Sequence, residues 1–156
     1  MSEGEWVSLV LILAFLTFSA FFSSSEAAFL SLQRTRLTHL VNTGIPGAAR
    51  VASMIKQPER LLSTILLGNN LVNVAFTALV TVVMVSLFDE GWGVPVATGV
   101  GTLVLLMVGE TIPKTFAVRH PERMAFFYAR PLKWIENLMW PLIIVLQWTT
   151  HRIGSL

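Results

Sequence analysis

Four uncharged, mainly apolar stretches divide the chain, and they occupy residues 6–25, 61–88, 91–109 and 137–150. The first three approach or exceed the roughly 20 apolar residues that a helix needs to cross a lipid bilayer. The fourth has 14 residues, a length typical of a buried or interfacial helix. The pattern predicts an all-α membrane protein with three transmembrane helices, at about residues 6–32, 61–88 and 92–118, and an interfacial helix at about residues 131–150.

Charges between the stretches predict how the helices are oriented. Five basic residues and one acid lie between residues 33 and 60, whereas the connection at residues 89–92 has two acids and no base. The positive-inside rule makes the first connection cytoplasmic and the second external. Five more basic residues follow the third stretch: Lys114, Arg119, Arg123, Arg130 and Lys133. We therefore expect the N-terminus outside and the C-terminus in the cytoplasm.

The fourth stretch is predicted to lie at the inner membrane interface rather than to cross the bilayer. Pro131 suits the start of a helix, and tryptophans are enriched at the level of the lipid headgroups. Three tryptophans fall in or beside this stretch: Trp134, Trp140 and Trp148. If the stretch crossed, the C-terminus would emerge outside behind a single Arg152, an arrangement that the charge rule supports poorly.

The basic connection at about residues 35–57 has room for a cytoplasmic helical hairpin. Residues 35–41 and 46–55 are each long enough for a short helix, and the Asn-Thr-Gly sequence at 42–44 suits a helix end. Pro46 suits the first turn of the second helix. A solvated connection with no further role is the alternative.

Composition agrees with a membrane domain and narrows the chemistry. Hydrophobic residues make up 54% of the chain and charged residues 13%, which is unusual for a soluble domain. The net charge of +2 gives no indication of nucleic-acid binding. Because the chain has no cysteine, a disulfide framework and thiolate metal ligands are excluded, and oxygen ligands favour hard cations.

Polar residues inside the three long stretches form compact clusters at similar depth. Glu26 lies eight residues before Arg34, and Glu110 lies nine before Arg119, which places both about 12–15 Å from the cytoplasmic boundary; Asn70 lies at the same level. A charged side chain at such depth costs at least about 2.5 kcal/mol, so we expect compensating partners. The clusters are Ser23, Ser24, Ser25 and Glu26; Gly68, Asn69, Asn70 and Asn73; and Gly109, Glu110, Pro113 and Lys114.

Two interpretations of these clusters remain open. Serine and asparagine can join membrane helices by hydrogen bonds alone, but carboxylate, amide and hydroxyl oxygens at one depth are also the ligands of Mg²⁺ or Na⁺. Pro113 cannot donate to the Gly109 carbonyl, so we expect a broken helix there, with Gly68 as a second candidate break. A simple proline kink is the alternative.

Small residues at four-residue spacing predict close helix packing. One series is Ser19, Ser23, Ala27 and Ser31, and the other is Gly93, Ala97 and Gly101. The second series is a candidate homodimer face, but packing within one subunit explains it equally well.

The clusters, in this order, closely resemble the DUF21 transmembrane domain of the CorC/CNNM family. The matching runs are Ser-Ser-Ser-Glu-Ala-Ala at 23–28, Gly-Asn-Asn-Leu-Val-Asn at 68–73 and Gly-Glu-Thr-Ile-Pro-Lys at 109–114. The resemblance covers essentially the whole chain, residues 1–156, and the motifs themselves show no departure from the family pattern.

The resemblance implies a homodimeric, multi-pass transporter in the inner (plasma) membrane that exports Mg²⁺ using inward Na⁺ movement. It also implies that the helix at residues 131–150 is a juxtamembrane belt. Family members continue into cytoplasmic CBS domains, so we expect this chain to be a truncated form. The implied Mg²⁺ ligands are Ser25, Asn70 and Glu110, followed by Ser24, Glu26, Asn69, Asn73 and the Gly109 carbonyl; Gly68, Pro113 and Lys114 belong to the helix breaks.

Other functions are weighed against transport. An intramembrane protease needs a serine with a base, paired aspartates or a histidine pair at membrane depth, and Asp89 in the outer connection is the sole aspartate; we expect no enzymatic activity. An ion-sensing membrane anchor that controls CBS domains without transport would use the same ligands. A channel fits less well, because a dehydrating oxygen cage favours binding over rapid passage.

Overall fold

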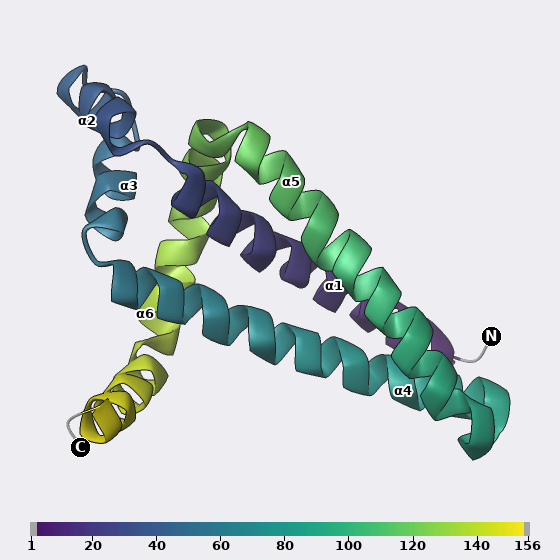
Figure 1. The fold of residues 1–156 in the computed structure, drawn as a ribbon. Coiled ribbons are helices and arrows are strands. Elements are labelled where there is room, and N and C mark those ends of the chain that lie inside the picture. Colours follow the sequence, from purple (N-terminus) through teal and green to yellow (C-terminus); the bar gives the residue numbers. More distant parts are fainter. Residues whose placement is uncertain (1–2, 155–156) are drawn as a thin grey trace.

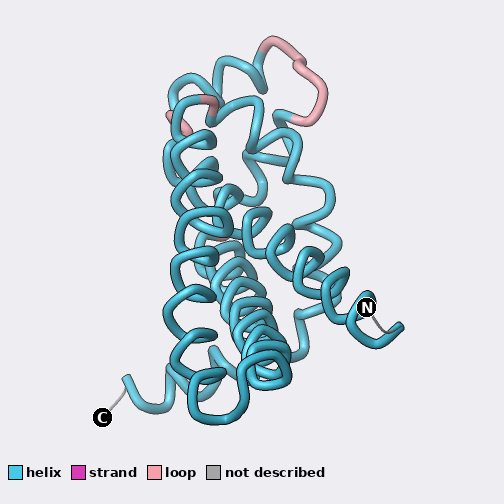
Figure 2. The backbone as a smooth tube through the Cα atoms, turned by 90° about the vertical axis from the view of Figure 1, so that its right-hand side faces the viewer, coloured by secondary structure: helices cyan, strands magenta, loops and turns pink. Residues whose placement is uncertain are grey.

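The computed structural model describes residues 3–154, without the side chains of residues 151 and 153, and its regular structure in that range is helical (Figures 1 and 2). Loops gather at one end of the molecule (Figure 2). In chain order the elements are α1 (Glu3–Ser31), α2 (Arg34–Asn42), α3 (Ala48–Ile55), α4 (Pro58–Val104), the π-helix η1 (Leu105–Thr111), α5 (Ile112–Arg119) and α6 (Pro121–Gly154).

Helix α4 contains a reversal of chain direction at Asp89. This residue has φ 72° and ψ 174°, a conformation that is rare outside glycine. Its carboxylate accepts hydrogen bonds from the amides of Gly91 and Trp92, at 2.8 and 3.3 Å, and so caps the start of the helical segment that runs back. We call this segment, residues 90–119, the returning arm. The returning arm then continues through η1 and α5 as far as Arg119.

Two helical stretches are long and apolar enough to cross a membrane, Glu3–Ser31 and Pro58–Arg119. Their most apolar windows have mean hydropathies of 2.2 and 2.3, and little of either window is buried inside the protein. Because the second stretch turns back at Asp89, it supplies two arms. The all-helical fold is confirmed, and the exposed apolar helices agree with a membrane protein.

The small-residue series on the returning arm packs within the chain. A Cβ atom at Gly93 would lie 2.5 Å from Val85 Cα, and one at Gly101 would lie 3.2 Å from a Val80 methyl group. Ala97 between them is 2% exposed. Of the two roles open for this series, the structure therefore selects close packing of the two arms of α4.

The hydrophobic core is divided into two parts along three long helical segments, which are α1, the part of α4 before Asp89 and the returning arm. One part surrounds Phe76, Val80 and Ala97, near the Asp89 reversal. The other, at the end where α2, α3 and α6 lie, includes Phe22, Ile65 and Ala117. Along α4 and along η1 and α5, the polar clusters fall between residues of the first part and residues of the second; on α1 they are interleaved with Phe22 of the second part. We call this region the polar layer: residues 19–26 of α1, 69–73 of α4 and 109–114 of η1 and α5.

Helix α6 begins at Pro121, ten residues before the predicted start at Pro131. Pro131 and Pro141 both lie inside the helix, and Figure 1 shows that its yellow C-terminal part changes direction, as expected of a proline-containing helix. The helix runs across the ends of α1 and α4 (Figure 1). Buried Ala125, Ala129 and Leu132 pack into the core below it, which explains why it starts earlier than its apolar stretch.

A buried carboxylate joins α6 to the start of α4. Glu136 is 2% exposed, and its Oε1 atom lies 2.5 Å from Arg60 Nε and 2.9 Å from Lys133 Nζ. The Arg60 Nε contact is an ion pair without hydrogen-bond alignment, whereas another guanidinium nitrogen donates to Asn137 at 3.1 Å. The guanidinium also stacks on Trp140, 3.9 Å from the ring centroid. Trp140, predicted as a headgroup-level anchor, therefore contacts Arg60.

The connection between α1 and α4 forms a packed helical hairpin. Leu37, Val51 and Met54 are buried in the core, so the hairpin is not merely a solvated connection. Pro46 lies before α3 rather than in its first turn, because Gly47 adopts φ 87° and the helix starts at Ala48.

Candidate functional site

The π-helix η1 carries Gly109 and Glu110 into the polar layer. The amide of Ile112 donates to the Met107 carbonyl, five residues earlier, as in π-helical geometry. Pro113 has no amide hydrogen for the Gly109 carbonyl, and the predicted irregularity appears as this widened turn rather than as an open break. Gly109 is buried, and a Cβ atom there would lie 2.9 Å from Ser19 Oγ. Glycine thus permits the close approach of α1.

A chain of hydrogen bonds links three helical segments within the layer. Ser19 on α1 donates to Asn73 Oδ1 on α4 at 2.7 Å, and Asn73 Nδ2 donates to Glu110 Oε1 on η1 at 3.0 Å. Both polar ends of the Asn73 amide are therefore occupied. The other Glu110 oxygen accepts no hydrogen bond from the described residues, so Asn73 orients a carboxylate that keeps one oxygen available to a cation.

A second set of polar contacts lies nearer the end where α6 crosses. Ser23 on α1 and Asn69 on α4 are 3.5 Å apart, at the limit of a hydrogen bond. Glu26 on α1 forms an ion pair with Lys114 on α5 at 3.0 Å. Glu26 and Asn69 are thus near neighbours of the first set but have different partners.

Asn70 points to another side of α4. It is exposed and lines a shallow groove of about 440 Å³ with Asn73, Val74, Thr77 and Ala78. It makes no side-chain hydrogen bond with the described residues. The groove places Asn70 beside Asn73, and hence close to the amide that orients Glu110.

The three consecutive serines face different directions, because successive residues on a helix point about 100° apart. The Ser25 hydroxyl donates to the Phe21 carbonyl of its own helix at 2.7 Å. The Ser24 hydroxyl lies 2.9 Å from the Tyr128 hydroxyl on α6, and so away from Asn73 and Glu110. Within residues 3–154 no hydrogen bond joins Ser25 to Asn70 or Glu110, so the structure does not assemble the three first-choice ligands.

Gly68 is a packing residue, contrary to its prediction as a helix break. Helix α4 continues through it, and a Cβ atom there would lie 2.4 Å from the Phe22 ring. Phe22 is buried in the core, so glycine is needed for space at this position.

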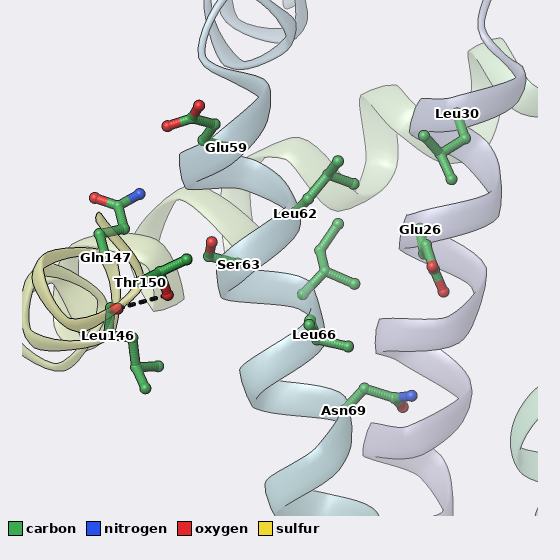
Figure 3. Close-up of a pocket in the computed structure, with 11 residues that line it drawn as sticks. Glu26, Leu30, Glu59, Leu62, Ser63, Leu66, Asn69, Leu146, Gln147 and Thr150 are labelled. Atoms are coloured by element: carbon green, nitrogen blue, oxygen red, sulfur yellow. Dashed lines mark hydrogen bonds between the residues drawn. The ribbon is translucent and has the colours of Figure 1, made fainter. Parts of the chain in front are cut away.

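A cavity of about 470 Å³ lies between α1, α4 and the C-terminal part of α6. Figure 3 shows Glu26 and Asn69 pointing into the space between α1 and α4, with Glu59 and Gln147 at the other end. Leu62 and Leu66 lie between these polar ends. The cavity therefore runs from the end of the molecule that bears the hairpin to the edge of the polar layer.

The donor set fits a hard cation held partly by water. Among the described residues, no three His, Cys, Asp or Glu side chains cluster as metal ligands. The layer instead offers amide, hydroxyl and carbonyl oxygens with single carboxylates, which suits Mg²⁺ or Na⁺ and gives no preference for transition metals.

Sequence reasoning missed two polar members of this region, Ser19 and Tyr128. The four-residue spacing predicts only a packing role for Ser19, although its position one turn before Ser23 gives it the same face of α1. Tyr128, which meets Ser24, gave no local signal in the sequence.

A comparison with protein families matches residues 10–156 to the cyclin M transmembrane N-terminal domain. Among individual proteins, the chain is 41% identical over 135 residues to the UPF0053 inner membrane protein YfjD of Escherichia coli. It is 38% identical to a UPF0053 protein of Haemophilus influenzae and 36% identical to a chloroplastic DUF21 domain-containing protein of Arabidopsis thaliana. These matches cover 86%, 86% and 85% of this chain, but only 31%, 32% and 20% of those proteins.

Proposed function

The chain belongs to the CorC/CNNM family, and on that premise we propose that it is the ion-translocating membrane domain of a magnesium transporter. The family is linked to membrane ion transport. Mg²⁺ as cargo, Na⁺ as the coupling ion and export as the direction are our proposal for this chain.

One observation carries the proposal: Ser19, Asn73 and Glu110 are connected across three helical segments, and one Glu110 oxygen accepts no hydrogen bond from any residue that the structure describes. If the layer only joined the helices by hydrogen bonds, neutral polar side chains would be sufficient and no carboxylate would be needed. A half-buried carboxylate at membrane depth is costly, and a bound cation would compensate it.

The proposed ligands are Glu110, Asn70, the Ser25 hydroxyl and the Gly109 carbonyl, with water completing the shell. Mg²⁺ requires near-octahedral oxygens at about 2.1 Å and gives up water reluctantly. Asn70 and Ser25 must therefore turn toward Glu110 when the ion binds. Asn73 serves mainly to orient Glu110, because both ends of its amide are already occupied. Glu26 and Asn69 lie at the cavity edge, on the approach to the site.

We propose that the chain lies in the inner (plasma) membrane and crosses it three times. The N-terminus would be outside, and the C-terminus and the hairpin would be in the cytoplasm. The Asp89 reversal divides the second apolar stretch into two crossings, and Asp89 and Glu90 lie at one end while Arg34, Arg60 and Arg119 lie at the other. Helix α6, which crosses that basic end, is the belt. Ions would enter from the cytoplasm through the cavity of Figure 3, and external Na⁺ would compete for the same acids.

A homodimer fits the exposed polar groups on α4. Asn70 is exposed on a helix that we place in lipid, where its amide would find no water. The neighbouring Thr77 already donates its hydroxyl to the Asn73 carbonyl at 2.8 Å. A second copy on this face would cover the groove that they line. In longer relatives the domain would act together with cytoplasmic CBS domains.

Transport is tested by Mg²⁺ flux from liposomes that contain the purified protein. We expect flux that rises severalfold with an opposing Na⁺ gradient and falls at least about tenfold in Asn70→Ala, since that variant removes a ligand oxygen. Asn42→Ala, an exposed residue at the end of α2, is the matched control and should leave flux unchanged.

Binding of Mg²⁺ without flux would instead favour the ion-sensing membrane anchor. Flux that is indifferent to Na⁺ would remove the coupling from the proposal while retaining transport.

A further inference from the structure

The ion pair between Glu26 and Lys114 lies beside the proposed site and bridges two of its segments. Glu26 follows Ser25 on α1, and Lys114 lies one helical turn after Glu110. Their charged atoms are 3.0 Å apart, and their side chains are 36% and 40% exposed. Glu26 also lines the cavity of Figure 3, so a cation arriving there meets a carboxylate that is already occupied by an ammonium group.

Formal charges in the polar layer depend on this lysine. The layer contains two acids and one base, Glu26, Glu110 and Lys114, and no other charged residue. With the lysine in place its formal charge is −1, so one Na⁺ would make it neutral. Bound Mg²⁺ would leave +1 if Lys114 stayed, but zero if Lys114 withdrew. An unbalanced charge at low dielectric is strongly unfavourable.

We propose that Lys114 is a tethered cation that holds Glu26 while the site is empty or contains Na⁺, and that it withdraws when Mg²⁺ binds. This inference rests on the proposed function and adds to it a control of ion binding. Lys114 competes with Mg²⁺ for Glu26, so the site contains either Mg²⁺ or Na⁺ at one time. Its long, flexible chain lets the ammonium move toward headgroups at the nearby membrane surface. Lys114 is therefore a positioning residue that acts through Glu26.

A purely structural ion pair would behave differently. If the pair only held α1 against α5, removal of either charge would lower stability and would leave Mg²⁺ affinity unchanged or weakened in both variants. Competition instead predicts opposite signs: Lys114→Gln removes the competitor and strengthens binding, whereas Glu26→Gln leaves the lysine unpaired beside the site and weakens it.

The test is Mg²⁺ titration calorimetry of the purified protein in Na⁺-free buffer, with thermal unfolding recorded for every variant. We expect Lys114→Gln to bind about tenfold more tightly, within the usual range of coupling between sites, and Glu26→Gln to bind several times more weakly. Lys114→Arg keeps the charge and should retain wild-type affinity. Lys133→Gln is the matched control, because Lys133 also pairs with a glutamate, at 2.9 Å, but outside the layer.

Each outcome decides a separate claim. If wild-type protein binds Mg²⁺ and Lys114→Gln binds equally or less tightly, the tethered-cation role is overturned while the proposed function stands. If wild-type protein does not bind Mg²⁺, both are overturned. Should Lys114→Gln not fold, the double variant with Glu26→Gln avoids an unpaired charge and must bind more tightly than Glu26→Gln alone; if it does not, the role is rejected.

Discussion

Replacing Glu110 with alanine is expected to reduce Mg²⁺ affinity by at least about 100-fold, because the variant removes both the charge and a ligand oxygen from the polar layer. Asn73 would also lose the acceptor of its amide hydrogen bond. Glu110→Gln keeps the shape and an acceptor oxygen, so it isolates the charge and should weaken binding by at least about tenfold. Titration calorimetry of the purified protein measures both effects.

The matched control for Glu110 is Glu122→Ala. Glu122 is a glutamate on α6 whose side chain is 40% exposed and pairs with Arg36 at 3.0 Å, outside the polar layer. Its removal should leave Mg²⁺ affinity unchanged. Wild-type affinity in Glu110→Ala, with the protein folded, would show that the layer is held together by hydrogen bonds alone and that the cation binds elsewhere.

Replacing Glu136 with alanine is expected to cause a large loss of stability. The variant would leave Arg60 and Lys133 without their common partner, and breaking a buried ion pair typically costs about 3–5 kcal/mol. Arg60 is 23% exposed and Lys133 37%, so solvent screening places the expected cost near the lower end of that range. The melting temperature of the purified protein in detergent reports the change.

Glu122→Ala again provides the comparison. It removes a carboxylate from the same helix, but its ion pair with Arg36 is exposed and is expected to contribute at most about 1 kcal/mol. Equal shifts in melting temperature for Glu136→Ala and Glu122→Ala would contradict the assigned role of Glu136 in fixing α6 to α4.

The long helices could be predicted because bilayer length and uncharged runs constrain them directly. The reversal at Asp89 follows from two acids between apolar stretches, and the hairpin from its Asn-Thr-Gly sequence. The start of α6 is not evident from the sequence, because Glu122, Arg123 and Arg130 interrupt the apolar pattern of its first ten residues and Pro131 also suits a helix start. Only the packing of Ala125 and Ala129 against the core shows that they belong to it.

The polar layer could be predicted as a set of residues but not as a set of contacts. A buried glycine can relax a helix or make room for a neighbour, and only the Phe22 ring above Gly68 decides between these. Likewise, the three serines share a depth, but helical rotation turns Ser24 toward Tyr128. The Arg60 and Glu136 pair joins residues far apart in sequence, so no local pattern indicated it.

The central claim is that the polar layer binds a divalent cation, and crystals of the protein grown with Mn²⁺ test it most directly. Mn²⁺ accepts the same oxygen ligands as Mg²⁺ and gives an anomalous X-ray signal. We predict one strong anomalous peak per chain between α1, α4 and η1, bonded to Glu110 and Asn70 oxygens at about 2.2 Å. Peaks confined to surface acids such as Glu59 or Glu122, with none in the layer, would contradict the claim.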